Sequence, residues 1–234
     1  MCRSTNTRNK RRRTSLYVRV NDQHIVIDTP PDFRDQVLTY GLTRVDRVLI
    51  THPHADHIFG FDDLRRFSYM QAMSIPVHGS PATIKELQQK FHYVTEDSIW
   101  RASVPRATFQ PMTHVETWAG VEIEPVPAPH GPMQVYGYIL RCGGRSIGYL
   151  PDCSAMDDAL MARWQGLDVM VLDALRHKPH PTHLSLTEAI EALQHIRPRT
   201  GYLTHLCHDL EHETVNAALP TGIQVAYDGL TLEW

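Results

Sequence analysis

The feature that most constrains this chain is the run His-Pro-His-Ala-Asp-His at residues 52–57. It directly follows an apolar, β-branched stretch, 45–51, which predicts a strand, and a strand exit is a usual place for functional side chains. Imidazole and carboxylate groups at this spacing can converge on one or two divalent ions. A polar loop with merely hydrogen-bonded histidines is the alternative, but no packing role needs these residue types together. The four potential ligands are His52, His54, Asp56 and His57.

Three further potential ligands each follow a predicted strand: His130 in Ala-Pro-His-Gly, Asp152 in Leu-Pro-Asp-Cys and His205 in Leu-Thr-His-Leu. Together the candidates number seven, enough for two divalent ions. Two such ions lower the pKa of a shared water, so that hydroxide is available at neutral pH. The set therefore predicts a hydrolase. Zinc and manganese both accept mixed nitrogen and oxygen ligands, so the choice between them stays open.

The hydropathy pattern predicts a single α/β catalytic domain over 15–234, preceded by a basic segment, 1–14. A turn at Asn21-Asp22 joins the first two strands as a hairpin. The stretch 92–118 has no clear pattern. Expected helices are 31–40, 60–70, 81–91, 185–195 and 211–219, and expected strands are 15–20, 24–28, 45–51, 121–126, 135–141, 145–150, 168–172, 201–203, 223–226 and 230–234.

Composition excludes several classes of protein. No stretch approaches the length of an apolar membrane span, and the N-terminus lacks the apolar core of a secretory signal, so we expect a cytoplasmic protein without membrane contact. The four cysteines form no Cys-x-x-Cys pair, which suits a reducing compartment. A net charge of −3 gives no general attraction to nucleic acid, and we interpret the basic run at residues 8–13 as a solvated, flexible segment.

The ordered set His-x-His-x-Asp-His, distant His, Asp and final His resembles the metallo-β-lactamase superfamily. Within it the chain resembles the PhnP-type phosphoribosyl cyclic phosphodiesterases. The strings that carry this likeness are Asp-His-Ile-Phe-Gly-Phe-Asp-Asp-Leu-Arg at 56–65, His-Leu-Ser-Leu-Thr-Glu-Ala at 183–189 and Thr-His-Leu-Cys-His-Asp at 204–209. The resemblance implies an α/β fold, the αβ/βα four-layer sandwich, with the metals at one edge, and a phosphodiesterase that acts on a small cyclic phosphate ester.

The resemblance also implies roles for individual residues. His52, His54 and His130 would hold one metal ion, Asp56, His57 and His205 the second, and Asp152 would bridge them. Asp56 and His183 are the expected catalytic residues, with His183 as the general acid that protonates the leaving alkoxide. Ser185 would be a phosphate or backbone partner nearby. Asp28, at a strand end, would hydrogen-bond the metal loop, with a simple strand cap as the alternative.

Relatives of this type begin with a further strand and a cysteine cluster that binds structural zinc. This sequence starts too late for either, so we expect a fold that lacks the first strand. Either the natural protein starts upstream, or this form is weakened or rescued by a partner. Cys2 and His208 are the residual candidates for that zinc site.

Two alternative functions remain. A tRNA 3′-end processing endonuclease would use the basic segment, although no substrate-binding arm is recognisable. A non-catalytic metal-binding module would result if the late start inactivates the site. Homodimerisation and the physiological substrate stay open.

Overall fold

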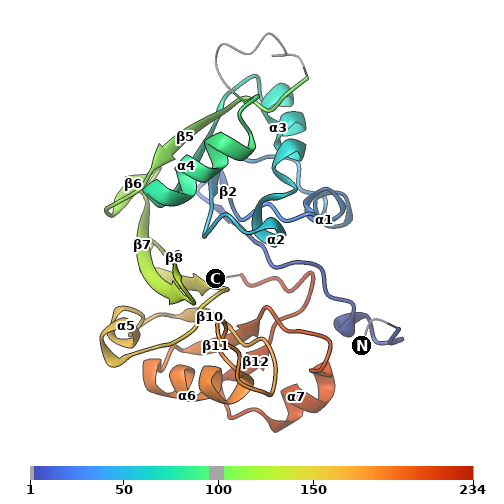
Figure 1. The fold of residues 1–234 in the computed structure, drawn as a ribbon, viewed down its shortest axis with the longest axis vertical. Coiled ribbons are helices and arrows are strands. Elements are labelled where there is room, and N and C mark those ends of the chain that lie inside the picture. The colour runs from blue at the N-terminus through green and yellow to red at the C-terminus, as the bar shows by residue number, and fades with distance from the viewer. Residues whose placement is uncertain (1–2, 95–102, 234) are drawn as a thin grey trace. The chain divides into compact units, whose positions relative to one another are not determined.

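The computed structural model describes residues 3–94 and 103–233. Its contacts divide the chain into two compact units, drawn in Figure 1. The N-terminal unit is Arg13–Val115, and the C-terminal unit is Glu116–Trp234 together with Met1–Arg12. Each unit contains one β-sheet. Within the described ranges, no helix combines the length and the apolar character needed to cross a membrane.

The N-terminal unit contains a five-stranded sheet in the order β1-β2-β3-β4-β5. Asn21 and Asp22, which join β1 to β2, both have positive φ angles (49° and 58°), as a two-residue hairpin turn requires. The predicted hairpin is thereby confirmed, and β2 to β5 pair in parallel. The strands are β1 (Leu16–Val20), β2 (Gln23–Ile27), β3 (Arg47–Leu49), β4 (Ile75–Gly79) and β5 (Ala107–Pro111).

Local sequence signals determine where two helices of this unit end or begin. α1 stops at Gly41, whose φ of 65° is the left-handed conformation that glycine adopts without strain. α4 starts after Ser80, whose side chain accepts a hydrogen bond from the Thr83 backbone N–H. The helices are α1 (Phe33–Tyr40), α2 (Ala55–Ile58), the 3₁₀ turn η2 (Phe61–Asp63), α3 (Leu64–Met70) and α4 (Pro81–Lys90). Their apolar side chains pack with Val26 and Val48 in one core.

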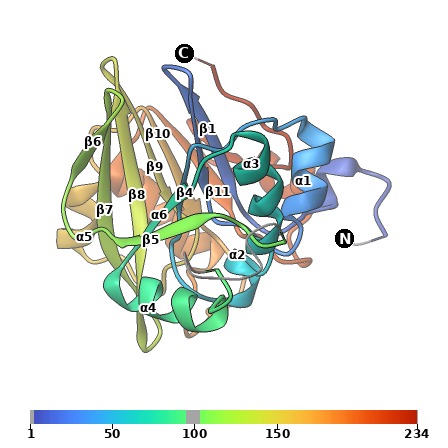
Figure 2. The same ribbon diagram turned by 90° about the horizontal axis from the view of Figure 1, so that it is seen from above.

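The C-terminal unit contains a seven-stranded sheet in the order β12-β11-β10-β9-β8-β7-β6. The strands from β9 to β12 are parallel, so their carboxyl ends lie at one edge of the sheet. β7 and β8 form a long antiparallel pair, which Figure 2 shows running side by side. The strands are β6 (Glu116–Trp118), β7 (Val121–His130), β8 (Met133–Cys142), β9 (Arg145–Leu150), β10 (Val169–Asp173), β11 (Thr200–Thr204) and β12 (Ile223–Val225).

The helices of this unit are α5 (Asp158–Arg163), α6 (Leu186–Ile196) and α7 (His212–Ala218), with a 3₁₀ turn η1 (Thr7–Asn9) in the N-terminal segment. The predicted capping box is confirmed, because Ser185 and Glu188 satisfy each other's backbone donors at the start of α6. Trp164 is fully buried at the centre of the core. It packs so close to the strands that a Cβ at Gly137 would lie 2.6 Å from its ring, which explains the glycine.

Several predicted elements were wrong or incomplete. The terminal strand at 230–234 is absent over residues 230–233, which have no regular structure. β4 was not predicted, and neither was α5. The unpatterned stretch 92–118 contributes β5 and β6, while 95–102 lies outside the described residues. The missed strands are short, and β4 and β5 each contain a proline, which weakens the signal of a strand.

The basic N-terminal segment differs from the flexible segment that we expected. Asn9 is buried; its side-chain amide donates to Glu211 (2.7 Å) and its Oδ1 accepts from the His212 backbone N–H (2.8 Å). Arg11 donates to the Cys207 carbonyl at 3.0 Å, and the backbone N–H of Arg12 donates to Asp228 at 3.0 Å. Charge runs are usually solvated, but here one polar residue within the run supplies the buried anchor.

Candidate metal centre and catalytic residues

The N-terminal unit brings together the four predicted ligands of the 52–57 run. β3 and the two residues after it are buried, and they lead into the short helix α2, which carries Asp56 and His57. His52 Nε2 lies 2.9 Å from His54 Nδ1, and His57 Nε2 lies 3.8 Å from Asp56 Oδ2. The rings of His52 and His57 have centroids 4.2 Å apart. Nitrogen and oxygen donors at these separations are able to share a divalent ion.

Asp28 fixes the position of this loop through hydrogen bonds. It follows β2, is fully buried, and adopts a φ of 65°, a strained backbone conformation for a residue with a side chain. Its carboxylate accepts from the Thr51 backbone N–H, from the Thr51 hydroxyl and from His57 Nδ1, each at 2.8 Å. Burial raises the pKa of Asp28, and His57 and Thr51 oppose that rise. The expected hydrogen bond to the metal loop is present.

The C-terminal unit gathers its candidates at the carboxyl edge of its parallel strands. Asp152 follows β9, His205 follows β11, and His130 ends β7 beside the exit of β9. Asp152 lies between the others: its Oδ2 is 3.6 Å from His130 Nε2, and its Oδ1 is 3.6 Å from His205 Nε2. This central carboxylate is 2% exposed. The position suits a ligand that serves two ions.

The imidazole tautomers also suit metal binding. His130 Nδ1 lies 2.6 Å from the Thr182 carbonyl oxygen, to which it donates, and His57 Nδ1 donates to Asp28. In both rings Nε2 is then left as the electron-pair donor, the arrangement in which histidines usually bind metal ions. In the C-terminal unit, one ligand atom each from Asp152, His183 and His205 lies within 4.8 Å of the others. The donor chemistry therefore fits divalent ions such as zinc or manganese.

His183 is held by a carboxylate that sequence reasoning missed. Asp173, the last residue of β10, is fully buried, and its Oδ2 accepts from His183 Nδ1 at 3.0 Å. The same oxygen accepts from the backbone N–H groups of Cys153 (3.1 Å) and Leu184 (3.2 Å). His183 Nε2 lies 3.8 Å from Asp152 Oδ2, so the ring presents this nitrogen to the predicted metal ligands.

Burial and neighbouring charges shift the pKa of Asp173. Burial raises its pKa well above the ordinary value, the charge of Asp152 raises it further, and His205 lowers it. A signal for this residue was available in the sequence. β10 is an apolar strand that ends on Asp, the same pattern that singled out Asp28.

The remaining predicted residues are Ser185, His208 and Cys2. Ser185 is 3% exposed, and its hydroxyl is occupied by the capping box with Glu188, so the backbone role is the one observed. His208 has a 75% exposed side chain that faces Asp209 at 3.6 Å. Cys2 lies outside the described residues. The residual structural-zinc site therefore stays a prediction.

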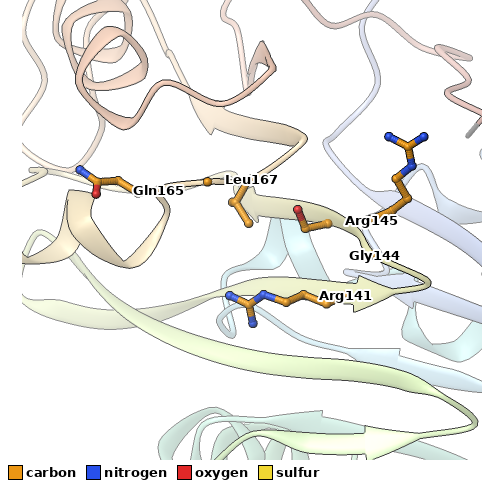
Figure 3. A pocket seen from close by; sticks show the side chains of 7 residues that line it. Arg141, Gly144, Arg145, Gln165 and Leu167 are labelled. Atoms are coloured by element: carbon orange, nitrogen blue, oxygen red, sulfur yellow. The ribbon is translucent and has the colours of Figure 1, made fainter.

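A separate hollow of about 240 Å³ lies at the opposite ends of the same strands, around the β8–β9 turn. Figure 3 shows Arg141, Arg145 and Gln165 around it. Its arginines are already neutralised, since Arg141 bonds Glu122 (2.8 Å) and Glu124 (2.6 Å), and Arg145 faces Asp168 at 3.7 Å. This hollow carries no catalytic cluster.

Comparison with known proteins identifies the family. Residues 23–206 match the beta-lactamase superfamily domain. A crystal structure of a new diphosphatase from the PhnP family is 37% identical, covers 100% of this chain and 88% of its own, and superposes with a TM-score of 0.90. The family match and this structure confirm the predicted metallo-β-lactamase fold class, and the lack of a first strand stays a prediction. Zn(2+)-bound PqqB from Methylobacterium extorquens is 19% identical, covers 96% of this chain and 88% of its own, and shares the fold with a TM-score of 0.76.

Among curated proteins, an octanoyltransferase of Porphyromonas gingivalis is 29% identical over 98% of this chain. This chain spans only 46% of that relative's length, so the name describes a protein about twice as long. The family match extends over both groups of candidate ligands. The chain therefore belongs to the beta-lactamase superfamily, and within it to the PhnP family.

Proposed function

We propose that the chain is a two-metal hydrolase that cleaves a phosphodiester, with a small cyclic phosphate as the preferred class. The observation that carries this proposal is the pair Asp173–His183, which adds an oriented proton donor beside Asp152. A site that only stores metal has no need of such a donor. The ligands that we propose for the two ions are His52, His54, Asp56, His57, His130, Asp152 and His205.

Two bound divalent ions would supply a hydroxide from a shared water and stabilise the charge on the phosphate oxygens. The protein's own contribution is the placement of the proton donor. Asp173 accepts from His183 Nδ1, which fixes the ring so that Nε2 faces Asp152, and as the general acid His183 would donate the proton on Nε2. When hydroxide forms the new P–O bond and the alkoxide leaves with its electron pair, that oxygen takes the Nε2 proton. His183 is then neutral and keeps its Nδ1–H.

A second candidate substrate is a diphosphate. The similarity to a PhnP-family diphosphatase at 37% identity favours it, and the same residues would act on a phosphoanhydride. A diphosphate differs in its leaving group, a phosphate that needs less help from an acid than an alkoxide does. Dependence of the rate on His183 therefore separates the two candidates.

The test is a substrate panel with metal-stripped protein reloaded with zinc or manganese in parallel. It contains adenosine 2′,3′-cyclic phosphate, bis-p-nitrophenyl phosphate, a nucleoside diphosphate and a pre-tRNA. We expect metal-dependent turnover of the diesters. Turnover of pre-tRNA alone would support the endonuclease alternative. Folded, metal-loaded protein that hydrolyses nothing in the panel would support the non-catalytic module.

A further inference from the structure

Arg11, in the N-terminal segment, contacts the loop that begins at the proposed metal ligand His205. Its Nη1 donates to the Cys207 carbonyl oxygen at 3.0 Å, two residues beyond that ligand. Asn9 binds the far end of the same loop, at residues 211–212. These contacts all lie within the C-terminal unit. The N-terminal segment is therefore fastened to this loop at two places.

The backbone of His205 has an unfavourable conformation. Its φ is 57°, in the left-handed region, which is costly for a residue with a side chain and persists only where neighbouring contacts enforce it. Cys207 supplies such contacts on both of its sides. Its N–H donates to the Leu175 carbonyl at 2.8 Å, and its carbonyl accepts from Arg11. In this conformation His205 Nε2 lies 3.6 Å from Asp152 Oδ1, so the backbone beyond the ligand helps to set where its ring points.

The position of Arg11 is unfavourable for the fold. Its Nε and Nη2 are buried, and neither has a hydrogen-bond partner among the described residues. Buried donors without acceptors are costly, above all on a charged group. Burial lowers the pKa of Arg11, although Cys207 and two carboxylates nearby oppose the change. The Cys207 carbonyl also accepts from the Leu210 N–H at 3.4 Å, so it does not depend on the guanidinium. Folding stability alone does not explain this arginine.

We propose that Arg11 is a positioning residue for metal binding: by holding the Cys207 carbonyl, it keeps His205 in the orientation that presents Nε2 to the metal ion. This inference rests on the proposed ligation of the second ion by His205, and it extends the metal centre to the N-terminal segment. Because coupling between two events is reciprocal, metal binding in turn holds the segment in place.

The test separates metal binding from folding stability. The variant is Arg11→Met, which keeps a long side chain without the guanidinium, and the control is Lys10→Met, which removes the same charge from the exposed neighbour. Zinc-loaded protein is titrated with a chromogenic chelator. Arg11→Met should lose affinity for one of the two ions by about 10–100-fold, as loss of a residue that orients a ligand predicts, and should keep its affinity for the other. Lys10→Met should bind both ions as wild type does.

Folding stability should not follow the metal affinity. After removal of the metal, urea denaturation should find Arg11→Met at least as stable as wild type, because the substitution removes two buried donors that have no acceptor. Lower stability of metal-free Arg11→Met would overturn the proposal, since the arginine would then act on the fold as a whole. Equal losses of affinity for both ions, or no loss for either, would overturn it as well.

Hydrogen exchange makes the test independent of the ligand assignment. In metal-free protein, the Cys207 backbone N–H, which is bonded to Leu175, should exchange faster in Arg11→Met than in wild type or in Lys10→Met. Exchange at the wild-type rate would show that Arg11 does not hold the loop. If wild type binds fewer than two ions, the proposed function fails, while the exchange rates still decide the role of Arg11.

Discussion

The proton-donor role that we propose for His183 predicts an effect that depends on the leaving group. Replacing His183 by Ala removes the Nε2 proton, and positioned acids typically contribute about 10²–10⁴-fold to a rate. This corresponds to about 3–5 kcal/mol of transition-state stabilisation. The full loss is expected for adenosine 2′,3′-cyclic phosphate, which expels an alkoxide. Little loss is expected for bis-p-nitrophenyl phosphate, whose phenolate leaves without protonation.

Asp173→Asn tests the same proton transfer by removing the carboxylate that accepts from His183 Nδ1. The Asp173 oxygen lies 3.0 Å from His183 Nδ1, and the carboxylate is fully buried. If both groups carry a full charge, a separation of 3.0 Å gives an attraction of about 5.5 kcal/mol at an effective dielectric constant near 20, which sets an upper limit of about 10⁴-fold on the loss. Asn keeps an oxygen that accepts from the Cys153 and Leu184 backbone N–H groups, so the fold should survive.

The assay measures kcat/KM for both substrates in wild type, both single variants and the double variant, with metal content determined for each protein. The double variant should be no slower than His183→Ala, because Asp173 acts only through that ring. Equal losses for the alkoxide and phenolate substrates would refute the general-acid assignment. Fully additive losses would refute the coupling to Asp173.

Three further predictions concern metal binding, the core and the N-terminal anchor. Asp28→Ala should weaken metal binding about 10–100-fold, since His57 loses the acceptor that orients its ring. Competition with a chromogenic chelator measures the metal affinity. An unchanged affinity would leave Asp28 as a strand cap. Trp164→Ala should lower the free energy of unfolding, measured by urea denaturation, by about 3–5 kcal/mol, because Trp164 is fully buried. A loss below about 1 kcal/mol, close to the effect of a surface substitution, would contradict its central position. Hydrogen bonds from Asn9, which has the largest effect, and from Thr214 lower the pKa of Glu211 to about 2, so the stabilisation from its ionised form is present above its ordinary pKa and is lost as the pH falls towards 2. Asn9→Ala should raise the pKa of Glu211 and reduce the loss of folding stability in this pH window. NMR titration measures the pKa of Glu211 directly. An unchanged value would show that Asn9 does not anchor the segment.

Local sequence signals predicted much of the fold because they act over a few residues. The Asn21-Asp22 turn is an example, since these residue types tolerate the positive φ angles that a hairpin turn needs. The Ser185–Glu188 capping box is another. Where local signals were weak, the prediction failed. β4 carries Pro76, and the apolar residues at the C-terminus form no strand over 230–233.

By itself, the sequence determined the chemistry available to this protein: a loop of histidines and an aspartate after a buried strand, and further potential ligands at later strand ends. Only the tertiary structure decided how these groups are held. Pairing of β9, β10 and β11 brings Asp152, Asp173 and His205 to one sheet edge although they are far apart in the chain. Hydrogen bonds that Nδ1 of His57, His130 and His183 donates to distant oxygen atoms then fix the orientation of each ring and of its Nε2. These contacts join residues that are distant in the sequence. Local sequence patterns do not predict them, because burial and strand pairing depend on the folded arrangement of the whole chain.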